Sequence, residues 1–225
     1  MADYRVDKAE ALRYLGYAGQ QTDEALDGRI DELIAACERD SKPAYLYRIF
    51  PVAEEDAGVR LAGSSLVLTG DAIREHLHGA RECAVMACTL GLANEIAQQR
   101  LKAKGALDAV VFGAAGSSLV ECVADACEAA IVADGAARGL HTNFRFSPGY
   151  GDLPLEIQPA IVRTLDADKK LGLTVTPSNL LIPVKSVTAF VGLFDTLQTN
   201  TKRTCAGCAC AAHCQLRKAG TPCYR

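Results

Sequence analysis

The stretch FRFSPGYGDLPLEIQPAIVRTLDADKKLGLTVTPSNLLIPVKSVTAFVGL, residues 144–193, carries most of what the sequence says about the fold. Near its start, Ser147-Pro148-Gly149 is typical of a tight turn, in which glycine permits positive φ and lets a ligand approach the backbone. Arg145 precedes the turn at the end of a predicted strand, where a guanidinium can hold a carboxylate through two parallel hydrogen bonds. Tyr150 adds an aromatic face and a hydroxyl. The combination suits a zwitterionic, amino-acid-like ligand, although spacing alone favours a plain strand-turn-helix junction with a surface arginine.

Hydrophobic periodicity along the chain predicts a mixture of helices and strands. Expected helices cover residues 7–15, 23–40, 71–77, 92–104, 107–138 and 155–171. Expected strands cover residues 44–52, 59–70, 83–90, 141–147, 173–176 and 180–194. We expect Thr22 to cap the second helix, a break near Gly113–Gly116 in the fifth, and an interruption at Pro159 in the sixth. Strict strand-helix-strand alternation is missing, which favours an α+β fold with a twisted antiparallel sheet flanked by helices.

Length and composition allow one large domain, or one domain with an appendage. The chain has 225 residues, of which 49% are hydrophobic and 23% charged. Its longest run without Asp, Glu, Lys or Arg is 14 residues, 171–184, whereas a membrane-spanning helix needs about 20 apolar residues. The N-terminal sequence has neither a basic start nor an apolar segment of the kind found in signal peptides. We therefore expect a cytoplasmic protein that does not contact a membrane.

The segment from residue 144 resembles the S-adenosylmethionine-binding part of the activation domain of cobalamin-dependent methionine synthase. The family pattern of Arg-x-x-x-Gly-Tyr falls on Arg145, Gly149 and Tyr150. Its later features fall on Leu165-Asp166, Gly172-Leu173-Thr174, and Pro183 through Ser186-Val187. The likeness covers about 50 residues closely and the rest of the chain loosely, in the manner of short stand-alone members. In two places the chain departs from the family: Gly139 replaces an acidic residue, and a cysteine-rich tail replaces a segment with a ligand-contacting tyrosine.

The resemblance implies a ligand, a reaction and partners. Arg145 would bind the carboxylate of S-adenosylmethionine, and Pro148, Gly149, Tyr150 and Gly151 would line the rest of that ligand. The implied function is reductive reactivation of methionine synthase or a related corrinoid methyltransferase, in methionine biosynthesis. S-adenosylmethionine would supply the methyl group, and flavodoxin or ferredoxin would supply the electron. We expect cobalamin on the partner protein, because none of the four histidines lies in an Asp-x-His-x-x-Gly motif.

Ten cysteines fall into two groups. Five are scattered through apolar segments and are expected to be small buried hydrophobes: Cys37, Cys83, Cys88, Cys122 and Cys127. The other five crowd into residues 205–223, where Cys205 and Cys208 have C-x-x-C spacing. Four thiolates can hold zinc or an iron–sulfur cluster. The predicted metal ligands are Cys205, Cys208, Cys214 and Cys223.

The predicted domain organisation is an activation-domain-like unit at residues 1–196 followed by a metal-binding tail at 197–225. Every charged residue after Asp195 is basic. A basic tail could bind nucleic acid, but thiolates around a metal would supply negative charge within the tail itself. We therefore expect no nucleic acid partner. A rival hypothesis is a non-enzymatic interaction module of the same fold with a structural zinc knuckle. Binding of S-adenosylmethionine distinguishes the two.

Overall fold

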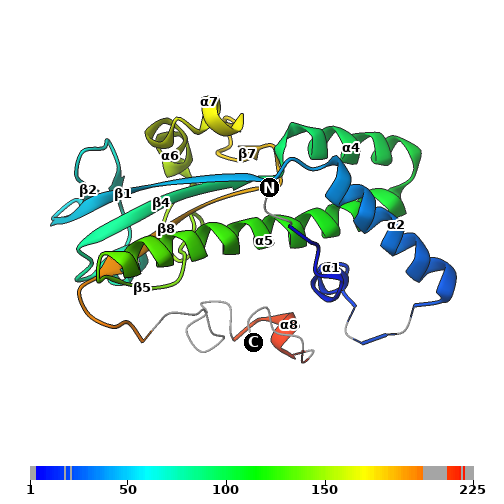
Figure 1. Ribbon diagram of the computed structural model, residues 1–225, viewed down its shortest axis with the longest axis horizontal. Helices are drawn as coiled ribbons and strands as arrows, with labels where there is room; N and C mark the ends of the chain where they lie inside the picture. The colour runs from blue at the N-terminus through cyan, green and yellow to red at the C-terminus, as the bar shows by residue number, and fades with distance from the viewer. Residues whose placement is uncertain (1–3, 18, 21, 200–211, 219, 221–225) are drawn as a thin grey trace.

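The computed structural model describes residues 4–17, 19–20, 22–199, 212–218 and 220, and its centre is a six-stranded antiparallel sheet (Figure 1). The strand order is β3-β2-β1-β4-β8-β5. The strands are β1 (Ala44–Glu55), β2 (Gly58–Leu61), β3 (Val67–Leu68), β4 (Glu82–Thr89), β5 (His141–Thr142) and β8 (Ser186–Phe194). A separate two-stranded sheet pairs β6 (Thr174–Val175) with β7 (Leu181–Ile182). The predicted α+β class with an antiparallel sheet is confirmed.

Helices cover both faces of the sheet (Figure 1). On one face lies α5 (Ala106–Ala137), with α1 (Lys8–Tyr14), α2 (Glu24–Asp40) and α4 (Gly91–Lys104) packed on it. On the other lie α3 (Asp71–Leu77), η1 (Leu155–Ile157), α6 (Gln158–Leu165) and α7 (Ala167–Leu171). In the described part of the tail, α8 spans Gln215–Lys218.

Alternation along the central strands divides the interior into two cores. On β4, Val85 and Ala87 pack with the α3, α6 and α7 side, whereas Ala84 and Met86 pack with α5. Successive side chains of a strand point to opposite faces, so a strand buried on both faces reads as a continuous apolar run. The sequence CAVMACTL shows this run. β4 is the middle strand of a β1-β4-β8 trio that holds the two layers together.

The helix α5 runs unbroken for 32 residues, so the break expected near Gly113–Gly116 is wrong. These glycines let other elements approach the helix closely: a Cβ on Gly113 would lie 2.5 Å from Nε2 of Gln98, and one on Gly116 would lie 3.3 Å from Cε of Lys185. Among the described residues, α5 is the one helix with the length and apolarity of a membrane span, but 61% of its most apolar window is buried inside the protein. It is the central helix of the core on its face of the sheet.

Of two other expected helix boundaries, one was wrong and one is confirmed. Asp23, and not Thr22, caps α2, because its carboxylate accepts a hydrogen bond from the N–H of Leu26 at 2.8 Å. The expected interruption near Pro159 is present, because the 3-10 helix η1 ends at Ile157 and α6 begins at Gln158. A second interruption, which was not expected, lies at Asp166, which adopts a left-handed conformation between α6 and α7. Pro159 is in the first turn of α6, where proline is tolerated because its missing N–H would have no helical partner.

Several predicted strands are shorter than the pattern indicated. The 59–70 stretch contains β2 and β3 with a loop between them, and the 180–194 stretch contains β7 and β8. In the 141–147 stretch only β5 and a single bridge from Phe146 to Phe190 pair with the sheet. Of the five scattered cysteines, Cys122 is half-buried and the other four are buried as expected.

Candidate functional site

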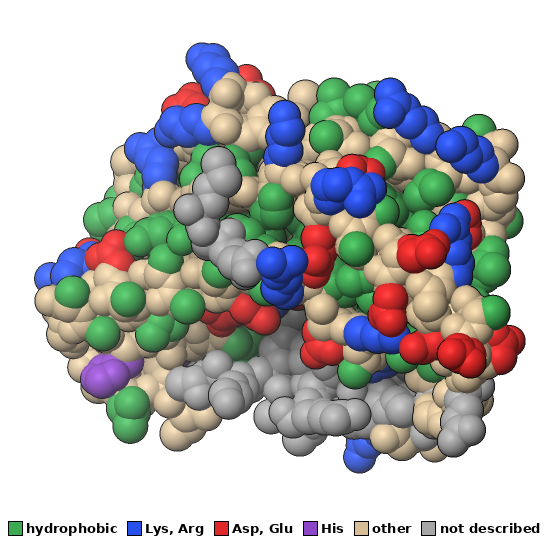
Figure 2. Space-filling model, turned by 45° about the vertical axis from the view of Figure 1, so that its right-hand side comes forward, with side chains coloured by type: hydrophobic (Ala, Val, Ile, Leu, Met, Phe, Trp, Pro, Cys, Tyr) green, Lys and Arg blue, Asp and Glu red, His purple; other side chains and the backbone are tan. Residues whose placement is uncertain are grey.

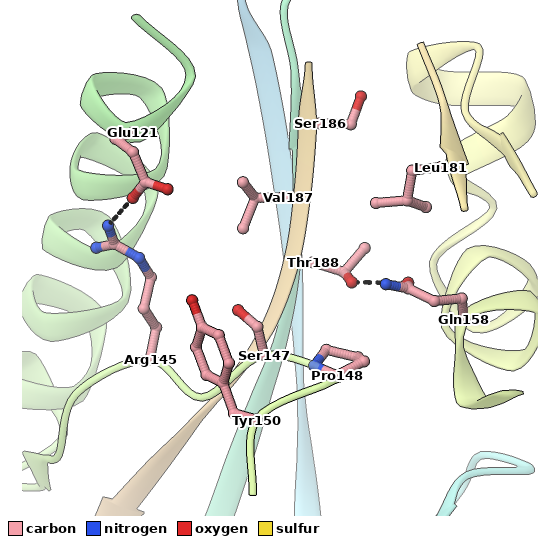
Figure 3. Close-up of a pocket in the computed structure, with 10 residues that line it drawn as sticks. All are labelled: Glu121, Arg145, Ser147, Pro148, Tyr150, Gln158, Leu181, Ser186, Val187 and Thr188. Carbon is pink, nitrogen blue, oxygen red and sulfur yellow. Dashed lines mark hydrogen bonds and ion pairs between the residues drawn. The ribbon is translucent and has the colours of Figure 1, made fainter. Parts of the chain in front are cut away.

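A pocket opens at the edge of the main sheet, between α5 on one side and α6 with β7 on the other (Figure 3). We call it the sheet-edge pocket. Its volume is about 190 Å³. The lining residues are Glu121, Arg145, Ser147, Pro148, Tyr150, Gln158, Leu181, Ser186, Val187 and Thr188.

The pocket exists because the edge strand β5 is so short. It pairs only with the far end of β8, His141 opposite Phe194 and Thr142 opposite Leu193. The chain then leaves the sheet and returns at one bridge, Phe146 to Phe190. Within the described chain, residues 186–189 of β8 therefore have β4 on one side and no strand on the other.

The Ser147–Tyr150 turn closes one end of the pocket. The N–H of Tyr150 donates to the carbonyl of Ser147 at 3.1 Å, and the N–H of Gly149 donates to that of Leu153 at 2.8 Å. Gly149 has φ of +88°, a left-handed conformation that side chains rarely adopt. The predicted tight turn with a conformationally required glycine is thus present.

A carboxylate fastens this turn to α3. Asp152 accepts hydrogen bonds from the N–H of Asp71 at 2.6 Å and of Ala72 at 3.0 Å. The hydrogen bond from Ala72 has the largest effect on the pKa of Asp152, and together with the bond from Asp71 it lowers that pKa. Gly151 has φ of +55°, and a Cβ there would lie 2.5 Å from Cβ of Ala72. Asp152 and Gly151 therefore fix the turn from outside the pocket.

The guanidinium of Arg145 lies at the pocket wall and contacts three carboxylates of α5. It donates to Glu121 at 2.7 Å and to Asp125 at 2.6 Å, and it also pairs with Glu128. Its own backbone N–H donates to Glu128 at 3.1 Å. Burial lowers the pKa of Arg145, but Asp125, Glu128 and Glu121 outweigh it and hold that pKa above its ordinary value. We call these four residues the Arg145 cluster; one cation among three anions leaves it with an excess of negative charge.

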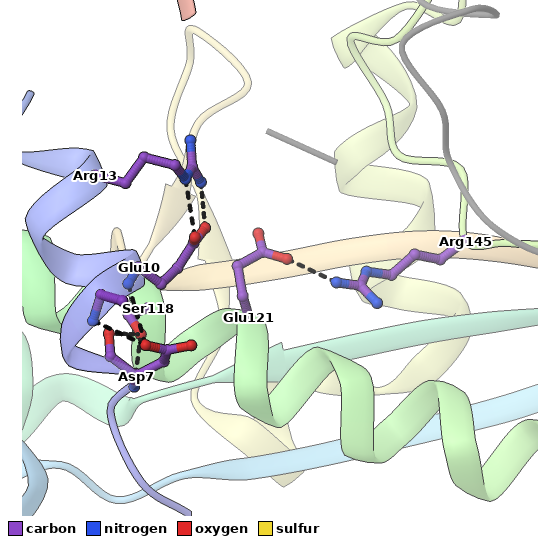
Figure 4. A network of polar contacts seen from close by, with 7 residues as sticks. Asp7, Glu10, Arg13, Ser118, Glu121 and Arg145 are labelled. Carbon is purple, nitrogen blue, oxygen red and sulfur yellow. Dashed lines mark hydrogen bonds and ion pairs between the residues drawn. The ribbon is translucent and has the colours of Figure 1, made fainter. Parts of the chain in front are cut away.

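The helix α1 lies beside this part of α5 (Figure 4). The hydroxyl of Ser118, three residues before Glu121, accepts from the N–H of Asp7 and donates to its carbonyl, both at 3.1 Å. On α1 itself, Glu10 and Arg13 form an ion pair. The contact with Ser118 explains how the N-terminal segment is held next to the Arg145 cluster.

The opposite wall of the pocket is less charged. The hydroxyl of Thr188 donates to Oε1 of Gln158 at 2.8 Å, and both side chains are buried (Figure 3). Tyr150 is 40% exposed, and its ring meets that of Phe146 edge to face with centroids 5.8 Å apart. A ligand here would meet the Arg145 cluster on one side and an amide-hydroxyl pair on the other.

Of the predicted ligand-binding residues, the pocket is lined by Arg145, Pro148 and Tyr150, while Gly149 and Gly151 shape the turn behind them. Sequence reasoning missed the acids of α5. Glu121, Asp125 and Glu128 recur at intervals of four and three, which places them on one face of a helix, and this spacing was the available signal.

The predicted metal ligands Cys205, Cys208 and Cys223 lie outside the described residues. Cys214 is described and half-buried, and its sulfur accepts from the N–H of Arg217 at 3.4 Å. In the described part of the chain, no group of three or more His, Cys, Asp or Glu side chains could hold a metal ion. The metal-binding tail stays a prediction.

Fold and pocket together define an α+β domain with a polar pocket at an open edge of an antiparallel sheet. A solved structure of the same fold is described as the MetH reactivation domain bound to AdoHcy. The two chains align with a TM-score of 0.64 and 14% identity, over 88% of this chain and 75% of the other. No family model and no curated protein matches this sequence. At this identity the likeness shows the fold.

Proposed function

We propose that the sheet-edge pocket binds S-adenosylmethionine, and that the protein serves in reductive reactivation of a cobalamin-dependent methionine synthase or a related corrinoid methyltransferase. The observation that carries the proposal is the lining of one pocket by Arg145, Pro148 and Tyr150, on the fold of a domain described with AdoHcy bound. AdoHcy is what S-adenosylmethionine becomes when it loses its methyl group.

The Arg145 cluster favours a zwitterion over a simple carboxylate. A bare carboxylate would add negative charge where negative charge is already in excess. An amino-acid group brings an ammonium as well. Its carboxylate can replace Asp125 on the guanidinium, since Asp125 is the most exposed of the three acids at 68%, and its ammonium can then pair with the released acid.

The proposed reaction needs alignment more than acid–base chemistry. The sulfonium already makes the methyl group electrophilic, so the protein has to hold it against the partner's cobalt and exclude water. One electron reduces cob(II)alamin, and the methyl group then passes to cobalt and leaves AdoHcy, giving methylcobalamin. A pocket at an open sheet edge suits this role, because the methyl group must remain reachable from another protein.

The remaining parts of the proposal concern partners and place. Cobalamin arrives on the methionine synthase or corrinoid protein, and flavodoxin or ferredoxin supplies the electron. The tail from residue 197 holds an iron–sulfur cluster or zinc through Cys205, Cys208, Cys214 and Cys223. An iron–sulfur cluster could pass on the electron that reactivation requires, whereas zinc would only stabilise the fold of the tail. The protein works in the cytoplasm.

Calorimetry with S-adenosylmethionine tests the ligand. The wild-type protein should bind it, and Arg145→Lys should weaken binding roughly tenfold or more, because lysine loses the bidentate geometry of a charged contact. Arg138→Lys is the matched control, since Arg138 also pairs with acids but lies outside the pocket. Failure of the wild-type protein to bind would overturn the proposal.

Reactivation tests the role. An inactive cob(II)alamin methyltransferase from the same cell should recover activity with S-adenosylmethionine and a low-potential electron donor only when this protein is added. Equal recovery without it, for every corrinoid protein tested, would leave the interaction module as the better reading. In that module Arg145 would keep its three carboxylates as a structural ion cluster and would bind no ligand.

A further inference from the structure

A second cavity, of about 280 Å³, lies on the α6 side of the sheet, away from the sheet-edge pocket. β1 lines this second cavity and β8 lines the sheet-edge pocket, and β4 lies between these two strands in the sheet. We call this cavity the arginine pocket. Its lining residues are Arg48, Phe50, Gly63, Ser64, Ser65, Arg163 and Thr164. They come from β1, the loop between β2 and β3, and the last turn of α6.

Among the described residues, the lining of the arginine pocket includes two arginines and no acidic side chain, so the pocket is positively charged. Most arginines of the described chain form ion pairs: Arg5, Arg13, Arg29, Arg39, Arg60, Arg81, Arg138 and Arg145. Arg48 and Arg163 form none with the described residues. Two guanidinium groups therefore share one cavity without a counter-charge from that part of the chain.

The Arg48 side chain is held in place on two sides. Its Nη1 donates to the carbonyl of Thr164 at 2.7 Å, and its guanidinium carbon lies 5.1 Å from the centre of the Phe50 ring. The Thr164 carbonyl belongs to the C-terminal end of α6, which carries partial negative charge and would otherwise repel an anion. Arg48 offsets that charge, and a guanidinium with five N–H donors retains others for a ligand.

The loop across from Arg48 offers further donors. Within the described residues, the N–H groups of Gly63 and Ser65 donate no hydrogen bond. Gly63 has φ of +79°, and no atom lies within 4 Å of the place a Cβ would occupy, so its backbone is open. Unpaired N–H groups in a turn form anion-binding concavities. Across the pocket, the buried hydroxyl oxygen of Thr164 also has no hydrogen-bond partner in the described chain.

We propose that the arginine pocket binds a phosphate group, either as inorganic phosphate or as the phosphomonoester of a larger molecule. Two guanidinium groups from different elements, with backbone N–H and hydroxyl groups in the same lining, match an anion whose oxygens point in several directions. A planar carboxylate would engage one guanidinium and leave the other unpaired. The proposal is independent of S-adenosylmethionine binding, because the two pockets share no lining residue.

Titration of the full chain with inorganic phosphate and separately with adenosine monophosphate, at constant ionic strength with chloride as the control anion, tests the proposal. Up to roughly 10 mM ligand, phosphate should bind and chloride should not. Equal affinity for the two phosphates indicates a site for the free anion, and tighter binding of the nucleotide indicates a site for a larger phosphorylated molecule. Both outcomes support the proposal.

Three variants give the decisive comparison. Arg163→Gln should weaken phosphate binding roughly tenfold or more, and Arg48→Gln at least as much. Arg100→Gln is the matched control and should leave the affinity unchanged, since Arg100 is an exposed arginine of α4 outside the pocket. Arg163 is exposed, so its loss tests binding even if Arg48→Gln disturbs α6. No phosphate binding by the wild type, or equal binding by Arg163→Gln, would overturn the proposal.

Discussion

Replacing Arg145 with methionine should lower the free energy of unfolding by about 2–3 kcal/mol. The Arg145 side chain is 15% exposed, and its loss leaves three acids on one face of α5 without the cation they share. Glu121 and Asp125 are 42% and 68% exposed and can turn to water, so their contacts contribute about 0–1 kcal/mol each. Glu128 is 19% exposed and accounts for most of the cost.

Urea unfolding followed by far-ultraviolet circular dichroism gives the magnitude, and an unchanged m-value would show that the folded state is otherwise intact. Arg138→Met is the control: Arg138 pairs with Glu82 and Asp134 but is 36% exposed, so its loss should cost no more than about 1 kcal/mol. Combining Arg145→Met with Glu128→Gln should cost less than the sum of the two single changes. A loss below about 0.5 kcal/mol for Arg145→Met, or strict additivity with Glu128→Gln, would refute the reasoning.

Three further predictions concern the turn and the tail. Gly151→Ala should destabilise the protein by about 2–4 kcal/mol, and more than Gly139→Ala does. Both positions have positive φ, but only at Gly151 would the new Cβ also collide with a neighbour. Urea unfolding of the two variants measures the difference. Asp152→Asn should lower the free energy of unfolding at neutral pH. The difference from the wild type should shrink as the pH falls through the folded-state pKa of Asp152, which lies below the ordinary value. A difference that stays constant from pH 7 to pH 3 would contradict this. Metal analysis of anaerobically purified protein should find iron with sulfide, or zinc, and Cys205→Ala should remove it whereas Cys122→Ala should not; a metal-free wild type would contradict the tail prediction.

Local patterns predicted the long elements well. The helix α2 was expected at 23–40 and is found at Glu24–Asp40, because apolar residues at intervals of three and four bury one face whatever the rest of the chain does. The helix α5 is a partial exception. Gly113 and Gly116 are unfavourable inside a helix, but the tight approach of Gln98 and Lys185 needs small residues there, and this depends on distant parts of the chain.

Short strands and the charged side of the pocket depend on tertiary structure. β5 and β7 have two residues each, too few for any alternation to be recognised. The sequence identified the Arg145–Tyr150 motif and the tight turn, because both are local. It did not indicate that Arg145 would face Glu121, since 24 residues separate them along the chain and only the packing of α5 beside β8 brings them together.

Within the described chain, residues 186–189 of β8 leave one strand edge unpaired, and this edge also bears on how copies of the protein could meet one another. An unpaired strand edge is a template on which a second molecule can add a strand, and natural sheets guard such edges with charge or with covering loops. Here the Ser147–Tyr150 turn covers one end, and Glu121 of the Arg145 cluster lies in the lining of the pocket beside this edge. Two molecules approaching edge to edge would bring like charges together, so the negative charge of this cluster would disfavour such pairing.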